Sequence, residues 1–230
     1  MPGARDCLLV VDVQNDFLPG GALAVPRGDE IVPAIGPLAR LFATVVLTQD
    51  WHPADHVSFA VHHPGRAPFE TIALPYGPQV LWPVHCVQES LGAALAEGLD
   101  VPHAAMIQRK GCHTAIDSYS AFLEADRATV TGLAGWLKAR GVERVFICGL
   151  ATDFCVAWTA GDARAAGFET VVVEDLCRAI DLDGSLEAGR IPRELVLQHV
   201  QSVRAIIAEQ AREESSTTAR LLAERLDEVT

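Results

Sequence analysis

Four continuous runs of apolar, β-branched-rich residues constrain the fold of this chain more than any other feature. They are CLLVVDV (7–13), ATVVLTQ (43–49), RVFICGL (144–150) and ETVVVED (169–175), and a weaker fifth run is AAMIQRK (104–110). Because these runs do not alternate with polar residues, they are typical of strands that are buried on both faces of a parallel sheet.

Helical stretches separate the runs, at 29–42, 133–141 and 152–167. Two of them stop at a glycine, Gly141 and Gly167, the residue that most often ends a helix. The alternation predicts a three-layer α/β/α domain built on a doubly wound, mainly parallel sheet of five to six strands.

The domain organisation is predicted to be simple. We assign residues 1–208 to one domain, because no linker interrupts them. From about Glu209 the chain becomes rich in Ala, Glu and Arg, so we expect residues 209–230 to form a charged, helical C-terminal tail.

Composition excludes several classes of partner. Half of the residues are hydrophobic, and 18 Lys and Arg stand against 30 Asp and Glu, a net charge of −12. This acidity argues against nucleic acid or an anionic membrane as the main partner. No apolar run approaches the roughly 20 residues that span a bilayer.

Cysteine usage indicates the compartment. The six cysteines form no CxxC pair, and the start MPGARD has no signal-peptide pattern. We therefore expect reduced thiols and a cytoplasmic protein.

Reactive side chains follow the predicted strands. In a doubly wound sheet the functional groups gather at the carboxyl ends of the strands. The first run leads to Asp12, the second to Asp50 and His52, the weak run to Lys110, and the third strong run to GLATDFC with Cys155. One acid, one lysine and one cysteine would then meet in one cleft.

Cys155 is the candidate nucleophile. The first turn of a helix carries about half a positive charge, which lowers a thiol's pKa and favours the thiolate. The alternative is that Cys155 is a small buried residue, as most free cysteines are.

Asp12 and Lys110 admit two interpretations that are compatible. An ionised side chain in an apolar run needs a partner, so they can form a structural ion pair. A carboxylate beside a thiol can equally accept its proton while the lysine balances the charge.

A metal site is predicted around Asp50 and His52, which lie two residues apart in an extended segment. His85 in LWPVHCV is the candidate third ligand, and His56 is either a fourth ligand or a residue that supports the ligands, the role we favour. Oxygen and imidazole ligands suit zinc, manganese or iron. The alternative is a set of surface histidines in a long loop.

Six motifs in order along the chain resemble nicotinamidases, cysteine amidohydrolases of the isochorismatase-like hydrolase fold that are also called pyrazinamidases. They are VVDVQNDFLPGGALAV (10–25), TQDWHPADHVSF (48–59), LWPVHCVQ (81–88), KG (110–111), DSYSAF (117–122) and GLATDFCV (149–156). The resemblance covers residues 7 to 183. The motifs around residues 48–59 and 81–88 are the most specific to nicotinamidases.

The resemblance implies a catalytic triad of Asp12, Lys110 and Cys155. It implies an oxyanion hole formed by the backbone amides of Ala151 and Cys155, with a cis peptide before Ala151. It also implies two sets of side chains around the substrate. The metal ligands are Asp50, His52 and His85. The aromatic residues against the pyridine ring are Phe17, Trp82 and Tyr119.

One segment departs from the family. The family has a helix and a short last strand after the stretch that matches DLDGS, and LEAGRIPRELVLQHVQSVRAIIAEQ fits that pattern poorly. This leaves the final strand, the packing of that edge and the oligomeric state open.

The predicted reaction is hydrolysis of nicotinamide, and of pyrazinamide, to the acid and ammonia through a thioester, which would feed NAD salvage. The alternative is a related amidohydrolase that acts on an N-carbamoyl, ureido or maleamate-type amide. Those relatives generally lack the metal set, which favours nicotinamide. A non-enzymatic metal- or nucleotide-binding module is disfavoured, because no GxGxxG follows the first strand.

Overall fold

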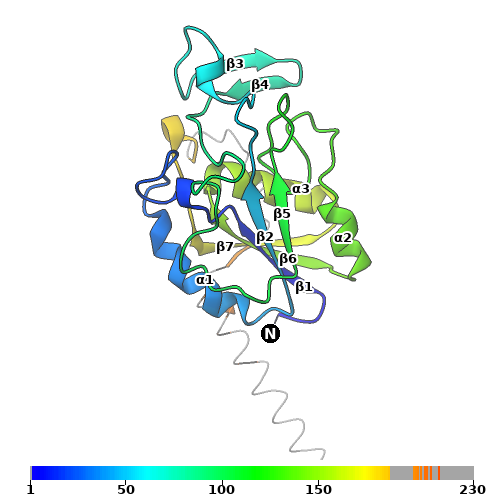
Figure 1. Ribbon diagram of the computed structural model, residues 1–230. Helices are drawn as coiled ribbons and strands as arrows, with labels where there is room; N and C mark the ends of the chain where they lie inside the picture. The colour runs from blue at the N-terminus through cyan, green and yellow to red at the C-terminus, as the bar shows by residue number, and fades with distance from the viewer. Residues whose placement is uncertain are drawn as a thin grey trace, which may run out of the picture.

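Six parallel strands form the centre of the protein. The computed structural model describes residues 2–186 and 199–201, together with the single residues 203, 205, 206, 208 and 212. The strand order is β5-β2-β1-β6-β7-β8 (Figure 1). The bounds are β1 Asp6–Val11, β2 Thr44–Asp50, β5 Met106–Lys110, β6 Arg144–Leu150, β7 Glu169–Arg178 and β8 His199–Gln201. The five runs that the sequence predicts as strands are all strands of this sheet.

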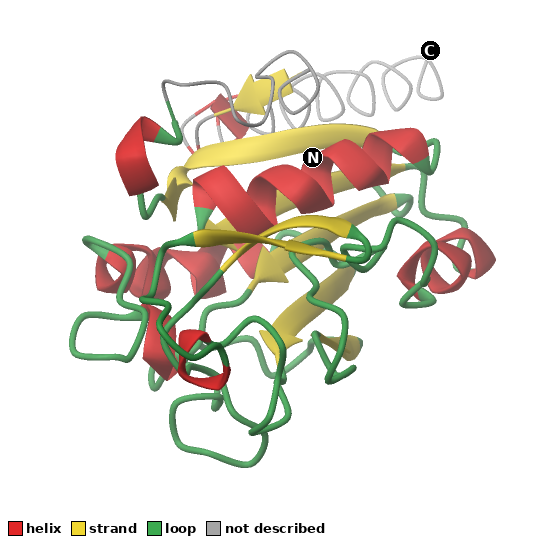
Figure 2. Ribbon diagram, turned by 90° about the horizontal axis from the view of Figure 1, so that it is seen from above, coloured by secondary structure: helices red, strands yellow, loops and turns green. Residues whose placement is uncertain are grey.

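Helices cover both faces of the sheet (Figure 2). Within residues 2–186, the α-helices are α1 Val32–Ala39, α2 Leu133–Ala139 and α3 Ala157–Ala165. The chain winds from β1 through α1 to β2 and β5, then crosses to the other side of β1 and continues through β6 and β7. Because such crossovers are right-handed, the two directions of winding put α1 on one face and α2 and α3 on the other. The doubly wound prediction is confirmed.

Shorter turns complete the helical elements. They are 3-10 turns η1 Asn15–Phe17, η2 Gly28–Ile31, η3 Ala60–His62 and η5 Leu182–Gly184, and a π-helical turn η4 Thr152–Val156. The predicted helix at 152–167 is therefore split into η4 and α3. Gly141 and Gly167, with φ of 71° and 94°, end α2 and α3 as predicted.

A small antiparallel hairpin lies apart from the main sheet. Its strands are β3 Thr71–Leu74 and β4 Gly77–Val80. The arrows of β2 and β5 point toward it in Figure 1, so it lies beyond the carboxyl ends of the strands. The sequence does not predict this hairpin, because each strand has four residues and Pro75 and Pro78 interrupt the pattern.

The far edge of the sheet answers one question that the resemblance leaves open. β8 pairs in parallel with β7, from Val171↔His199 to Val173↔Gln201, so a short last strand is present.

The predicted helical tail at 209–230 lies outside the described residues except for residue 212, and the domain bounds stay a prediction. Among the described residues, no helix is long and apolar enough to cross a membrane.

Candidate active site

The carboxyl ends of three neighbouring strands bring two acids and a lysine together. Asp50 and Lys110 are the last residues of β2 and β5 and are partners in the strand register. Asp12 follows β1 in a left-handed conformation, with φ of 49°. Lys110 Nζ lies 2.8 Å from Asp12 Oδ2 and also contacts Asp50 Oδ1. All three side chains are buried, so the ammonium is shared by two carboxylates.

Other bonds fix these side chains. Thr48 Oγ1 donates to Asp12 Oδ1 at 2.6 Å, and the Asp12 N–H donates to Thr48 Oγ1 at 3.0 Å. Lys110 Nζ donates to Ser118 O at 3.0 Å. Burial alone would lower the pKa of Lys110, but the carboxylates outweigh it and hold that pKa well above its usual value. Lys110 is therefore an ammonium.

Cys155 joins this group from the turn after β6. Its Sγ lies 3.4 Å from Lys110 Nζ, and one oxygen of Asp12, one of Asp50 and the sulfur lie within 4.8 Å of one another. The Leu150–Ala151 peptide just before the turn is cis, as the resemblance implies. The structure thus brings the three predicted triad residues into contact range.

The expectation of a lowered thiol pKa at Cys155 is wrong. Burial raises the pKa of the Cys155 thiol well above its usual value, and Asp12 and Asp50 raise it further against the pull of the Lys110 ammonium. The cysteine lies inside a buried π-helical turn, and its loss of hydration outweighs the attraction of the Lys110 ammonium. The sulfur therefore carries its proton at rest, and attack needs a base.

Asp12 is suited to that task. Burial raises its pKa above the ordinary value, Asp50 adds to this, and Lys110 opposes both. A raised carboxyl pKa brings a base closer to the pH at which it works and strengthens its hold on a proton.

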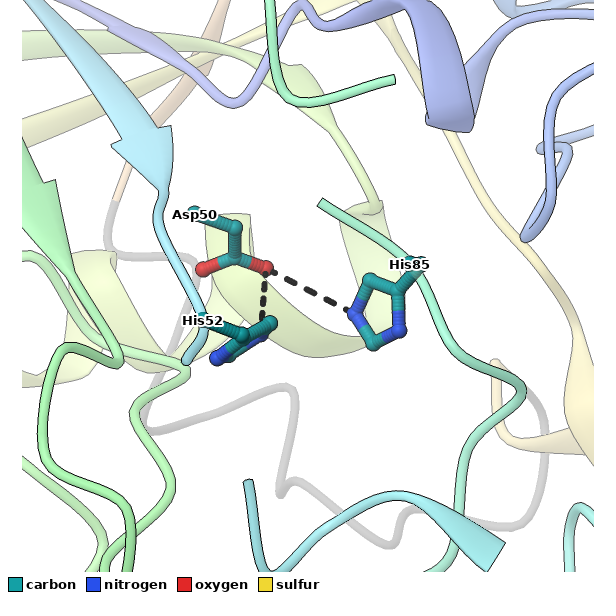
Figure 3. A group of neighbouring side chains, drawn as sticks. All are labelled: Asp50, His52 and His85. Atoms are coloured by element: carbon teal, nitrogen blue, oxygen red, sulfur yellow. Dashed lines mark ion pairs between the residues drawn. The ribbon is translucent and has the colours of Figure 1, made fainter. Parts of the chain in front are cut away.

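Asp50 also faces two histidines (Figure 3). Asp50 Oδ2 lies 3.6 Å from His52 Nε2 and 3.9 Å from His85 Nε2, and the three atoms lie within 4.8 Å of one another. Two ligands of one tetrahedral zinc ion are about 3.4 Å apart, given bonds of about 2.1 Å. The separations fit a single ion held by these three residues.

The hydrogen bonds of the two imidazoles support this fit. His52 Nδ1 bonds to Gly111 O at 3.0 Å, and His85 Nδ1 bonds to Pro83 O at 2.8 Å. A carbonyl only accepts, so each Nδ1 carries the hydrogen and each Nε2 directs a lone pair toward Asp50 Oδ2 when the ring is neutral. Metal-binding histidines are commonly oriented by such bonds.

The protonation of the rings differs. Burial, and then the neighbouring His52, lower the pKa of His85 to about 4. Burial alone would also lower the pKa of His52, but Asp50 outweighs it and raises that pKa. Metal ions bind neutral imidazoles, so a metal ion that binds here competes with a proton on His52.

Gly111 leaves room for the ring of His52. A Cβ atom at residue 111 would lie 2.4 Å from His52 Cε1, and the φ of +64° at this position also favours glycine. The glycine of the KG motif thus allows the ring to pack against the backbone that orients it.

His56 packs behind the ligands. Its ring centroid lies 4.3 Å from that of His52, and its Nδ1 and Nε2 bond to Ser58 Oγ at 2.8 Å and Ile116 O at 3.2 Å. His52, His56 and Asp117 also offer ligand atoms within 4.8 Å of one another. Because both nitrogens of His56 have protein partners, the arrangement favours the supporting role.

A cavity lies against both groups, because Cys155 of the first group and all three residues of the second line it. It is lined by Phe17, Leu23, Asp50, His52, Trp82, His85, Asp117, Ser118, Tyr119, Ala151, Phe154, Cys155 and Ile180. The three predicted aromatic residues are all in this wall. Trp82 Nε1 donates to Tyr119 Oη at 3.2 Å, which joins two of them.

Sequence reasoning missed some of this wall. Asp117 and Phe154 lie within the motifs that contain Tyr119 and Cys155. Their place in these motifs is the sequence signal that could have identified them as wall residues. Gln79 of the hairpin is buried below the wall, and its Nε2 contacts Asp117 Oδ2 at 2.6 Å and Tyr119 Oη at 3.2 Å. Nothing in the sequence marks Gln79.

Comparison with known proteins shows the family of the chain. The Isochorismatase domain model matches residues 6–190. A nicotinamidase of Acinetobacter baylyi is 60% identical over 188 residues, which cover 81% of this chain and 88% of the relative.

Two solved structures extend the comparison. An Acinetobacter baumanii nicotinamidase/pyrazinamidase is 55% identical, with a TM-score of 0.85, over 89% of this chain and 99% of that one. The pyrazinamidase of Pyrococcus horikoshii in complex with zinc is 35% identical, with a TM-score of 0.70, over 86% of this chain and 99% of that one.

Proposed function

This chain belongs to the isochorismatase family, and we propose that it is a nicotinamidase that hydrolyses nicotinamide, and also pyrazinamide, to the acid and ammonia. The observation that carries the proposal is one cavity with aromatic walls, which is lined by the thiol of the acid–lysine–thiol group and by all three residues of the acid–histidine–histidine group. Nicotinate is a precursor for NAD salvage, the role we propose for the product.

The first step is activation of the thiol. Asp12 takes the proton of Cys155, and the sulfur attacks the carboxamide carbon. Lys110 stays an ammonium and offsets the negative charge of Asp12, Asp50 and the sulfur, which lie within its reach. The raised pKa of the thiol makes this base necessary.

The tetrahedral intermediate carries a negative oxygen. We assign its stabilisation to the backbone N–H groups of Ala151 and Cys155, which belong to residues of the cavity wall. Asp12 returns its proton to the amide nitrogen, the C–N bond breaks and ammonia leaves. A thioester to Cys155 remains.

Hydrolysis of the thioester uses Asp12 again, first as a base and then as an acid. Asp12 removes a proton from water while the water oxygen attacks the thioester carbon. The C–S bond then breaks, the sulfur regains its proton from Asp12, and the acid leaves as nicotinate.

Asp50, His52 and His85 would hold the metal ion, with His56 packed behind them. When bound, a zinc, manganese or iron ion supplies an electrophilic anchor for the pyridine nitrogen, directly or through water. The ring would lie against Phe17, Trp82 and Tyr119, which line the cavity together with Cys155, and this placement would turn the carboxamide toward the thiol. We propose zinc as the natural ion.

The cellular setting follows from the chain's chemistry. All six cysteines are free, and the net charge is −12. We propose a cytoplasmic enzyme whose partner is its small-molecule substrate, with no nucleic acid or membrane partner. We also propose that the chain can assemble into a homo-oligomer.

Release of ammonia from nicotinamide tests the function. The purified protein should release equal amounts of ammonia and nicotinate, and a chelator should suppress the rate until zinc or manganese is restored. An N-carbamoyl amide and maleamate serve as competing substrates. Faster turnover of either one than of nicotinamide would refute the assignment.

A further inference from the structure

Gln14 makes an unusual set of contacts with Asp50. The Asp50 N–H donates to Gln14 Oε1 at 2.8 Å, and Gln14 Nε2 donates to Asp50 O at 2.8 Å and to Ala93 O at 2.9 Å. The side chain is fully buried. One amide thus bonds to both backbone polar groups of Asp50, and each of its two N–H bonds has an acceptor.

These bonds take the place of the hydrogen bonds between β1 and β2 beyond the point where that strand pairing ends. The register between β1 and β2 stops at Val10↔Leu47, because β1 turns away at Asp12. On the other side, β2 still pairs with β5, and the Trp51 N–H donates to Lys110 O at 3.0 Å. The N–H and C=O of Asp50 face the side that β1 has left. The side chain of Gln14 provides the two bonds that a strand residue would have made there.

The position of Asp50 matters because its carboxylate serves both halves of the site. Asp50 Oδ1 contacts Lys110, and Oδ2 faces the two histidines. A shift or rotation of this residue's backbone would move Oδ2 away from the point where both imidazole lone pairs converge. A group that orients a metal ligand typically affects affinity about 10- to 100-fold.

We propose that Gln14 is a positioning residue for the metal centre: it fixes the backbone of Asp50 so that one carboxylate reaches Lys110 and the metal together. The proposal rests on the metal site of the proposed function. Because Gln14 lies two residues after Asp12, one short segment carries both the base and the group that aligns the metal ligand.

Gln49 provides a matched control. Its Nε2 donates to the same carbonyl, Ala93 O, at 2.8 Å, and it is also buried. Its Oε1 accepts from Arg109 Nε at 3.3 Å, and neither of these bonds involves the backbone of Asp50. In Gln14→Met and in Gln49→Met the Ala93 carbonyl keeps one glutamine donor. Beyond that shared loss, Gln14→Met removes the pair of bonds to Asp50, whereas Gln49→Met removes the single bond from Arg109.

The test is the affinity for Zn²⁺ alone, without substrate. Metal-stripped proteins are titrated with Zn²⁺ against a chromophoric chelator, and thermal unfolding of the metal-free forms is recorded alongside. We expect Gln14→Met to weaken Zn²⁺ binding about 10- to 100-fold and Gln49→Met by less than about threefold, with similar changes in Tm. If Gln14→Met does not fold, Gln14→Asn replaces it, since its shorter amide cannot span both groups of Asp50.

The outcomes separate the two proposals. Zn²⁺ affinity of the Gln14 variant within about threefold of the unmodified protein, or an equal loss in Gln49→Met, would overturn the role of Gln14. If the unmodified protein binds no stoichiometric Zn²⁺ and yet releases ammonia from nicotinamide, the metal site fails while the amidase function stands. If it binds Zn²⁺ but hydrolyses no nicotinamide, the proposed function fails and the affinity comparison remains valid.

Discussion

The candidate active site has two halves that are built in different ways. One half lies at the strand ends and consists of Asp12, Asp50, Lys110 and Cys155, which follow or end neighbouring parallel strands. The other half comes from the segments before and after β5, where His52, Trp82, His85 and Tyr119 lie outside the main sheet. Backbone ladders position the first half, whereas individual hydrogen bonds to carbonyls and side chains position the second.

This difference suggests a division of labour. Bond making needs atoms held to within fractions of an ångström, and the sheet provides such a frame. Recognition of a ring and its nitrogen needs shape and a metal ligand set, and most of the residues that supply these lie in connecting segments outside the main sheet. We therefore expect damage to the strand-end half to lower kcat and damage to the loop half mainly to raise KM.

The largest effect is expected from Cys155→Ala, because no other group can form the thioester. We predict a loss of kcat of roughly 10⁴-fold or more in ammonia release. Cys148→Ala is the control, since Cys148 is equally buried in β6 but does not line the cavity. Substantial turnover by Cys155→Ala would contradict the covalent mechanism.

Asp12→Asn should come next, since it removes the base but keeps the shape of the side chain. We expect kcat to fall about 10²- to 10⁴-fold, and Lys110→Met to cause a loss of the same order. Thermal unfolding of both variants accompanies the kinetics, because breaking a buried ion pair also costs about 3–5 kcal/mol. Near-normal kcat with a lowered Tm would show that the residue has only a structural role.

His52→Ala tests the loop half. This variant should lose stoichiometric metal and raise KM strongly, while Asp12, Lys110 and Cys155 stay assembled. Its residual kcat should exceed that of Cys155→Ala. Elemental analysis and steady-state kinetics measure both effects, with the exposed His62→Ala as control. Full activity in His52→Ala, or active enzyme without metal, would show that the reaction does not need a metal ion at this site.

The smallest effect is expected from Gln79→Leu. Loss of its bonds to Asp117 and Tyr119 should raise KM about 3- to 10-fold and leave kcat nearly unchanged, since one hydrogen bond contributes about 1 kcal/mol. Gln108→Leu is the control: like Gln79, it donates to the carbonyl of the next residue at 2.7 Å, but it lies away from the cavity. A fall in kcat with unchanged KM would mean that the hairpin supports the chemistry and not recognition.

The strand-end half could be predicted from sequence because its rule is simple. Parallel strands end at one edge, so Asp12, Asp50 and Lys110 had to be near one another once the runs were recognised as strands. The pairing of His52 with His85 was not determined in this way. Spacing alone left a metal site and a surface loop as alternatives, and the resemblance to nicotinamidases decided between them.

Other features depend on tertiary contacts that no local pattern encodes. Gln79 becomes a buried donor only because a hairpin folds against Asp117. The thiol pKa of Cys155 was predicted in the wrong direction, because the degree of burial outweighs the position in a helix.

The central claim is that the strand-end half forms a thioester on Cys155. The most direct measurement is the ratio of nicotinate to ammonia released from nicotinamide as hydroxylamine is added, because hydroxylamine intercepts a thioester as the hydroxamate. We predict that nicotinate falls below ammonia by the amount of nicotinohydroxamate formed, without a comparable drop in ammonia release. Equal nicotinate and ammonia at every hydroxylamine concentration would show direct attack of water on the amide and contradict the account.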